Sequence, residues 1–216
     1  MDKNKILLPG LEKQINFLRK NLTSEINSAL VIGSASEIPA EIISKNFNCN
    51  VEVIVEDYES LLNSKLILRD ASKINIRLMG FEATDFNSSS FDLVYAQASI
   101  SSTKRNKIVK EVNRILKPGG LFCVGEIVVL NKDVPRFVQD IFDSSDLLPL
   151  FNNDLTKYYL ENKFTLNGSV DLTNTLKEFY LLNADMLKSS KGDLTSKKKV
   201  ITKSFSTKSA MSQMHI

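Results

Sequence analysis

Residues 91–129 read FDLVYAQASISSTKRNKIVKEVNRILKPGGLFCVGEIVV, and this stretch decides the fold. Apolar runs at 91–96 and 121–129 predict two buried strands. Between them, apolar residues recur at helical spacing while basic residues occupy the opposite face, which predicts an amphipathic helix. The apolar positions are Ile108, Val109, Val112, Ile115 and Leu116, and the basic positions, expected to face water, are Lys104, Arg105, Lys107 and Lys110. The stretch therefore predicts a strand, a helix and a second strand of a parallel sheet.

A Pro-Gly-Gly turn, Pro118 to Gly120, separates the predicted helix from the second strand. Proline disfavours helical geometry at Lys117, and glycine accepts a positive φ, so the chain is able to reverse sharply at this point. We interpret the turn as a structural device rather than as a ligand contact.

The rest of the chain continues the alternation of helices and strands. Further strands are predicted at 29–32, 51–55, 74–79 and 164–170, and further helices at 11–22, 39–45, 58–69, 134–142, 155–160 and 176–187. A seventh strand is expected at 200–206, at an edge of the sheet. This pattern predicts a doubly wound α/β fold, with a mostly parallel seven-stranded sheet and helices on both faces.

The length of 216 residues suits one domain with its own core. We expect this domain to span residues 1–187, and a segment rich in Lys and Ser to follow at 188–216. Such a charge run is able to attract phosphates. However, Phe205 is its only aromatic residue, and base stacking requires more. A solvated tail or edge strand is therefore favoured over nucleic-acid binding.

The composition is that of an ordinary globular protein, with 43% hydrophobic and 25% charged residues. No apolar run approaches the roughly 20 residues needed to cross a bilayer, and residues 1–10 lack the apolar core of a signal peptide. We therefore expect a cytoplasmic protein without a membrane partner. Cys49, Cys123 and His215 do not have the spacing of metal ligands, so no metal is expected.

The helix and turn carry the pattern E-x-x-R-x-L-x-P-G-G, formed by Glu111, Arg114, Leu116 and residues 118–120. Together with Ser-Phe-Asp at 90–92, this pattern resembles the fourth and fifth strand region of class I S-adenosylmethionine-dependent methyltransferases, of the small-molecule, type 11-like kind. The resemblance implies a Rossmann-like methyltransferase fold whose sheet ends in an antiparallel hairpin. It also implies S-adenosylmethionine as the cofactor and a small molecule as the methyl acceptor.

Ligands of a wound parallel sheet bind beyond the carboxyl ends of its strands. Gly33, Ser34 and Ala35 follow the first predicted strand and stand where the family carries a G-x-G-x-G loop. The sequence departs from that loop because Val31 replaces an acid, Ala35 replaces the second glycine and Glu37 the third. We expect Glu37 to crowd or repel the carboxylate of a cofactor.

Two acidic residues, Glu56 and Asp57, follow the second predicted strand. Glu56 lies 23 positions beyond Gly33 (56 − 33), close to the roughly 20 that separate a nucleotide loop from its ribose-binding acid. A carboxylate is able to accept both ribose hydroxyls through charge-assisted hydrogen bonds. Glu56 is therefore the principal ribose candidate, and a solvated acid at a strand end is the structural alternative.

Four further residues are expected near the cofactor. Phe81 and Glu82 follow the third predicted strand, where Phe81 either stacks on adenine or belongs to the core, and Glu82 supplies an acid. Ala96 and Gln97 are expected to line the mouth between cofactor and substrate. Glu126 interrupts an apolar run, which is costly unless the carboxylate is paired or faces a solvent-filled cleft. It is the candidate catalytic residue, to orient a nucleophile, unless it lies at the wet end of its strand.

Three functions remain open. The favoured one is a methyltransferase with a divergent cofactor loop, since methyl transfer requires chiefly alignment and a dry pocket rather than a fixed catalytic triad. The alternative is a binding or regulatory protein of the same fold that has lost cofactor binding. A nicotinamide-dependent oxidoreductase is disfavoured because the first loop lacks G-x-G-x-x-G. No pattern in the sequence indicates the acceptor or the oligomeric state.

Overall fold

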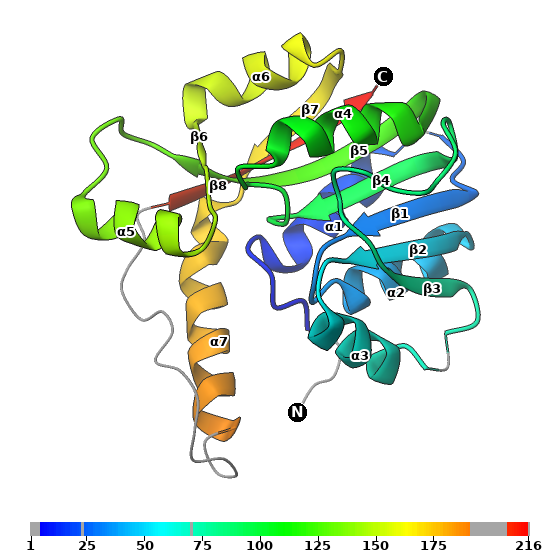
Figure 1. Ribbon diagram of the computed structural model, residues 1–216, viewed down its shortest axis with the longest axis horizontal. Helices are drawn as coiled ribbons and strands as arrows, with labels where there is room; N and C mark the ends of the chain where they lie inside the picture. Colours follow the sequence, from blue (N-terminus) through cyan, green and yellow to red (C-terminus); the bar gives the residue numbers. More distant parts are fainter. Residues whose placement is uncertain (1–4, 23, 70, 191–206, 216) are drawn as a thin grey trace.

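The computed structural model describes residues 5–22, 24–69, 71–190 and 207–215. Its centre is one sheet with seven strands in the order β3-β2-β1-β4-β5-β8-β7, and a short β6 pairs with the end of β5 (Figure 1). The strands are β1 (Ser28–Ile32), β2 (Asn50–Val55), β3 (Ile74–Leu78), β4 (Phe91–Gln97), β5 (Leu116–Val129), β6 (Leu150–Phe151), β7 (Thr165–Asp171) and β8 (Thr207–His215).

The sheet is mostly parallel, as the sequence predicts. At its centre, Val31 of β1 pairs with Val53 of β2 on one side and with Tyr95 of β4 on the other, all three strands running the same way. From β1 the sheet grows in one direction through β2 and β3, and from β4 onward it grows in the other direction. A wound sheet binds ligands at the carboxyl ends of the strands where this direction reverses, here between β1 and β4. The carboxyl ends of β1, β2 and β4 therefore frame the candidate site.

The last strand differs from the prediction. Residues 200–206 fall outside the described residues, and the observed strand β8 spans Thr207–His215. It lies between β5 and β7 and runs antiparallel to both, so β7 and not the final strand forms this edge of the sheet. β7 and β8 form an antiparallel pair at the end of the sheet, but α7 lies between them in the sequence, so they are not the expected hairpin.

The helices cover both faces of the sheet, as Figure 1 shows. They are α1 (Leu11–Asn21), α2 (Glu37–Phe47), α3 (Tyr58–Ile67), α4 (Arg105–Ile115), α5 (Arg136–Ser144), α6 (Leu155–Glu161) and α7 (Leu176–Ser190), with short 3-10 helices at Asn152–Asp154 and Thr173–Thr175. Side chains of each strand alternate between two cores. In β1, Leu30 and Ile32 share a core with α4 and α6, whereas Ala29 and Val31 share one with α1 and α2.

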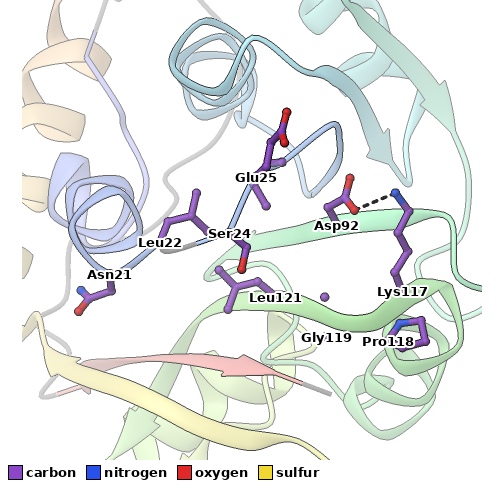
Figure 2. Close-up of a pocket in the computed structure, with 11 residues that line it drawn as sticks. Asn21, Leu22, Ser24, Glu25, Asp92, Lys117, Pro118, Gly119 and Leu121 are labelled. Carbon is purple, nitrogen blue, oxygen red and sulfur yellow. Dashed lines mark hydrogen bonds and ion pairs between the residues drawn. The ribbon is translucent and has the colours of Figure 1, made fainter.

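The Pro-Gly-Gly turn lies at the amino ends of β4 and β5, opposite the candidate site. Gly119 has φ 75°, and a Cβ on Gly120 would come within 2.8 Å of the Lys117 carbonyl oxygen, so both positions require glycine. The turn borders a cavity of about 130 Å³, where Lys117 pairs with Asp92 at 2.8 Å (Figure 2). Asp92 also accepts hydrogen bonds from the backbone of Asn27 and Ser28, so this corner joins β1, β4 and β5.

In the described part of the chain, no helix combines the length and the apolar character needed to cross a membrane.

Candidate functional site

The loop after β1 begins at Gly33, which has φ 121°. Its N–H donates to the Ile54 carbonyl of β2 at 3.0 Å. A Cβ at this position would lie 2.5 Å from the Cβ of Ser99, whose hydroxyl donates to the Ile32 carbonyl at 2.6 Å. The loops after β1 and β4 therefore meet at Gly33, and only glycine fits between them.

The other loop residues differ in exposure and in conformation. Ser34 and Ala35 are exposed, and Ala35 adopts φ 58°, a left-handed conformation that is uncommon for alanine. Ser36 is buried directly before α2, and its hydroxyl has no hydrogen-bond partner among the described residues. The loop thus presents a buried, unpaired hydroxyl at the amino end of an eleven-residue helix.

Glu37 does not point into the loop region in the way that we expected. Its side chain is buried and accepts a hydrogen bond from the Ser64 hydroxyl of α3. The carboxylate therefore ties α2 to α3, which explains how a bulky anion is accommodated where the family carries glycine. The expected repulsion of a cofactor carboxylate finds no support in this arrangement.

Glu56 and Glu82 come together beyond the ends of β2 and β3. The Lys104 ammonium joins them, at 3.3 Å from Glu56 Oε1 and 2.8 Å from Glu82 Oε1. The hydrogen bonds to Glu82 and Glu56 raise the pKa of Lys104, and the bond from Lys104 lowers the pKa of Glu82. Glu82 Oε2 is buried and has no partner among the described residues. This group of three charged residues is called the Lys104 cluster below.

Phe81 lies beside the Lys104 cluster. Its ring is only 6% exposed and belongs to the core beneath α4, while its N–H donates to Glu56 Oε1 at 3.4 Å. Glu82 also borders a groove of about 730 Å³ between α4 and the turn after α6. Two carboxylates, a buried aromatic side chain and a groove therefore lie next to one another beyond the ends of β2 and β3.

Asp57 serves α3 rather than the cluster. Its carboxylate accepts hydrogen bonds from the Ser60 N–H at 2.7 Å and from the Ser60 hydroxyl at 2.6 Å, the arrangement of a helix N-cap. These bonds lower the pKa of Asp57. The Ser60 hydroxyl is in turn 2.8 Å from that of Ser34, which connects the cap with the loop after β1.

Ala96 and Gln97 are both buried and hold the N-terminal segment. The Ala96 carbonyl accepts a hydrogen bond from Gln14 of α1 at 3.0 Å. Gln97 donates to the carbonyls of Pro9 and Leu11, at 2.9 and 3.0 Å, and accepts from the Tyr95 hydroxyl at 2.7 Å. The hydrogen-bonding groups of Gln97 are therefore occupied within the protein.

Glu126 is enclosed within a polar network between β5, α4 and α6. Its Oε1 accepts hydrogen bonds from Arg105 Nε at 2.9 Å and from the Tyr159 hydroxyl at 2.6 Å, and its Oε2 accepts one from the Ser101 hydroxyl. Burial raises the pKa of Tyr159 well above its ordinary value. The Glu126 carboxylate is therefore buried and paired with Arg105, and it does not lie at a solvent-exposed strand end.

The prediction that the basic residues of this segment face water is wrong for Arg105, which is 3% exposed and pairs with Glu126. Lys104 is 45% exposed, as expected, and also contacts the carboxylates that follow β2 and β3. Arg105 stands three, four and seven positions before Ile108, Val109 and Val112, so helical spacing places it on the apolar face of α4. Within the described residues, no three His, Cys, Asp or Glu side chains gather as a metal site requires.

Comparison with known proteins gives one family model that matches part of the chain, and one shared fold. Residues 30–124 match the family model described as a methyltransferase domain. No curated protein matches the sequence.

Several solved structures share the architecture. A provisionally named sarcosine dimethylglycine methyltransferase from Galdieria sulphuraria superposes with a TM-score of 0.76 and 13% identity, over 94% of this chain and 84% of that one. The geranyl diphosphate C-methyltransferase of Streptomyces coelicolor A3(2), solved with Mg²⁺, geranyl diphosphate and S-adenosyl-L-homocysteine, gives 0.73 and 14%, over 94% and 77%. The cyclase SpnF gives 0.70 and 12%, over 94% and 79%.

Such low identities establish the fold alone, whereas the family model matches the sequence itself. The matched segment contains the loop after β1, the Lys104 cluster and the E-x-x-R helix. Residues 30–124 therefore match a methyltransferase domain in sequence, and the chain shares the fold of solved methyltransferase structures.

Proposed function

We propose that this protein is an S-adenosylmethionine-dependent methyltransferase that acts on a small molecule. The observation that carries the proposal is the meeting of Glu56, Glu82 and Phe81 beyond the ends of β2 and β3, beside the loop at Gly33. Bound there, the cofactor would supply a methyl group on a sulfonium leaving group.

The residues at this corner fit the adenosyl half of such a cofactor. An adenosyl group offers hydroxyl and amino donors and a flat apolar ring. Glu56 supplies acceptor oxygens for the hydroxyl groups, and the unpaired, buried Glu82 Oε2 supplies one for an amino group. A buried acceptor without a partner costs free energy, so a donor from a ligand would stabilise it. Phe81 is buried in the core beneath this corner, and only its N–H contacts Glu56.

The loop at Gly33 fits a carboxylate at the other end of the cofactor. The amino end of a helix offers N–H groups that the helix itself does not pair, together with the positive end of its dipole, and both favour an anion; in α2, Pro39 contributes no N–H. The buried Ser36 hydroxyl adds an unpaired donor there. Ser34 and Ala35 remain proposed contacts through their exposed position in this loop.

The remaining candidates receive positioning roles. We assign Glu126 to holding Arg105 and Ser101, and thereby the loop after β4, rather than to moving a proton. Ala96 and Gln97 are assigned to docking the N-terminal segment over the carboxyl ends of the strands. Asp57 is assigned to capping α3 and orienting Ser34 through Ser60.

Calorimetry with S-adenosylmethionine and S-adenosylhomocysteine tests the proposal. We expect Glu56→Gln to weaken binding by about 1.5 to 3 kcal/mol, because hydrogen bonds to a charged acceptor are of that strength. The matched control is Glu59→Gln, which neutralises an exposed carboxylate in the first turn of α3 and should leave affinity unchanged. Absence of binding at millimolar cofactor, or an equal loss in both variants, would contradict the proposal.

A non-catalytic binding protein of the same fold is the second candidate. It is favoured by the changed cofactor loop, in which Val31, Ala35 and Glu37 replace the family residues. The fold itself also serves a protein named as a cyclase, SpnF, and fold does not determine function. A folded protein that does not bind S-adenosylmethionine at millimolar concentration would favour this candidate, which has lost cofactor binding.

A further inference from the structure

The Lys104 cluster contains an ion pair at the place where the proposed ligand needs free acceptors. Lys104 precedes α4 and lies 48 positions from Glu56 in the sequence, yet its ammonium contacts Glu56 Oε1 and Glu82 Oε1 at 3.3 and 2.8 Å. The same Glu56 oxygen also accepts the Phe81 N–H. Acceptor capacity that would serve a ribose is therefore already in use.

We propose that Lys104 competes with the adenosyl group for Glu56 and Glu82, so that binding requires the ammonium to leave. This inference rests on the proposed function. The lysine neutralises two neighbouring carboxylates that repel each other when the site holds no ligand. It leaves when the hydroxyl and amino groups of the ligand replace it as donors.

The three side chains of the Lys104 cluster are exposed enough for a ligand to replace their ion pairs. Lys104, Glu56 and Glu82 are 45%, 38% and 26% exposed, so water is able to solvate the ammonium once it is displaced. Ion pairs at such exposure are weak, typically about 0 to 1 kcal/mol, and they are screened by salt. Breaking them therefore lowers ligand affinity by a modest factor without preventing binding.

Lys104→Met tests this competition, with adenosine as the probe because it carries no charge. We expect the variant to bind adenosine and S-adenosylhomocysteine about two- to tenfold more tightly than the wild type, the factor that corresponds to one or two such pairs. The wild-type affinity for adenosine should also rise with ionic strength, because salt weakens the pairs that must break. In Lys104→Met this salt dependence should largely disappear.

Lys107→Met is the matched control, because Lys107 is an exposed lysine on the first turn of α4 and is not part of the cluster. It should leave both the affinity and its salt dependence unchanged. Weaker or unchanged adenosine binding by Lys104→Met, with wild-type binding intact, would overturn the competition and leave the proposed function standing. Absence of adenosine and S-adenosylhomocysteine binding in the wild type and in Lys104→Met would remove both.

Discussion

The carboxylate of Glu126 is only 1% exposed and receives hydrogen bonds from three side chains. Removing a carboxylate from such a network leaves the opposite charge, here Arg105, buried without compensation. The guanidinium also donates to the Leu148 carbonyl, so it is held in place by other contacts and is not free to turn to solvent. We therefore expect the network around Glu126 to contribute to folding stability rather than to take part directly in catalysis.

We expect Glu126→Ala to lower the free energy of unfolding by about 3 to 5 kcal/mol, the usual cost of breaking a buried ion pair from one side. Urea denaturation measures this loss. The double variant Glu126→Leu with Arg105→Met should regain most of it, because no charge is then left unpaired. Glu161→Ala is the control, since its pair with Lys157 is 64% and 74% exposed. A loss of similar size in Glu126→Ala and Glu161→Ala would contradict the assignment.

At this scale the sequence identified the unusual residue but not its partners. Glu126 stood out because it interrupts an apolar strand, and burial with pairing was one of the two expected outcomes. Helical spacing places Arg105 on the apolar face with Ile108 and Val112, so the sequence does contain a signal that this basic residue turns inward. Its partner cannot be read from that spacing, because only the approach of β5, α4 and α6 in three dimensions brings Glu126 to it.

The helix α4 is fixed to the preceding loop by the E-x-x-R pair. Glu111 accepts hydrogen bonds from the Thr84 N–H at 2.9 Å and from Arg114 Nε at 2.9 Å, and Arg114 also donates to the Phe86 carbonyl at 2.8 Å. The pair thus fastens the segment between β3 and β4, which carries Phe81 and Glu82 at its start. The motif that gave the family resemblance has a structural role in holding this side of the site.

Acid should weaken this attachment. The hydrogen bond from Arg114 and those from Thr84 lower the pKa of Glu111 from its ordinary value of 4.5 to about 2. Because the pKa is lower in the folded protein, the contribution to stability is complete above pH about 4.5 and is lost as pH falls toward about 2. We expect Glu111→Gln to cost about 1 to 3 kcal/mol at neutral pH, and the difference from the wild type to shrink over that acid range.

Urea unfolding at a series of pH values measures the effect on Glu111. Glu41→Gln serves as the control, because the Glu41 to Lys45 pair lies on the exposed side of α2 and should contribute little. A difference between Glu111→Gln and the wild type that stayed constant from neutral pH to pH about 2 would show that the charge of Glu111 is not what holds the loop.

Strands and helices were predicted well where apolar periodicity is strong. The segment 105–115 has apolar residues on one face only, and it forms α4 as expected. Apolar periodicity was less informative for α3, because the sequence offers all of its leucines as residues that could pack on the sheet. Leu62 and Leu66 are 46% and 73% exposed, whereas Leu61 packs into the core. A run of leucines without a clear polar face does not specify which side is buried.

Across the whole molecule, the N-terminal segment is joined to the sheet by two buried amides. Gln14 of α1 donates to the Ala96 carbonyl, and Gln97 of β4 donates to the carbonyls of Pro9 and Leu11. These bonds connect the beginning of the chain to the centre of the sheet, beside the candidate site. Loosening this connection should therefore affect the cover of the site without unfolding the sheet.

We expect Gln97→Leu to cost about 1 to 3 kcal/mol, because buried carbonyls and the Tyr95 hydroxyl lose their partner. Hydrogen exchange should become faster in α1 and remain slow in β1 and β2. Asn21→Ala is the control, since the Asn21 amide donates to the Phe17 carbonyl within α1 on the exposed side. Uniformly faster exchange across the sheet would indicate global destabilisation in place of a released segment.

At this largest scale, the sequence determined the layers and the winding of the sheet but not its final pairing. Alternating strands and helices leave few arrangements for β1 to β5, because parallel strands require crossover connections. The segments after β5 are connected differently, and an antiparallel strand fits on either side of its partner. The inner position of β8 is therefore a property of the folded sheet that the pattern of apolar residues does not contain.

The position of β8 has a consequence for how the protein is made. Both long sides of β8 are paired, to β5 and to β7, although β8 follows both of these strands in the sequence and is synthesised after them. During translation, β5 and β7 must wait with open edges, and open edges invite pairing with other nascent chains. A stalled or prematurely released polypeptide that lacks residues 207–215 would accordingly expose both edges and bind chaperones, rather than fold as a slightly shortened protein.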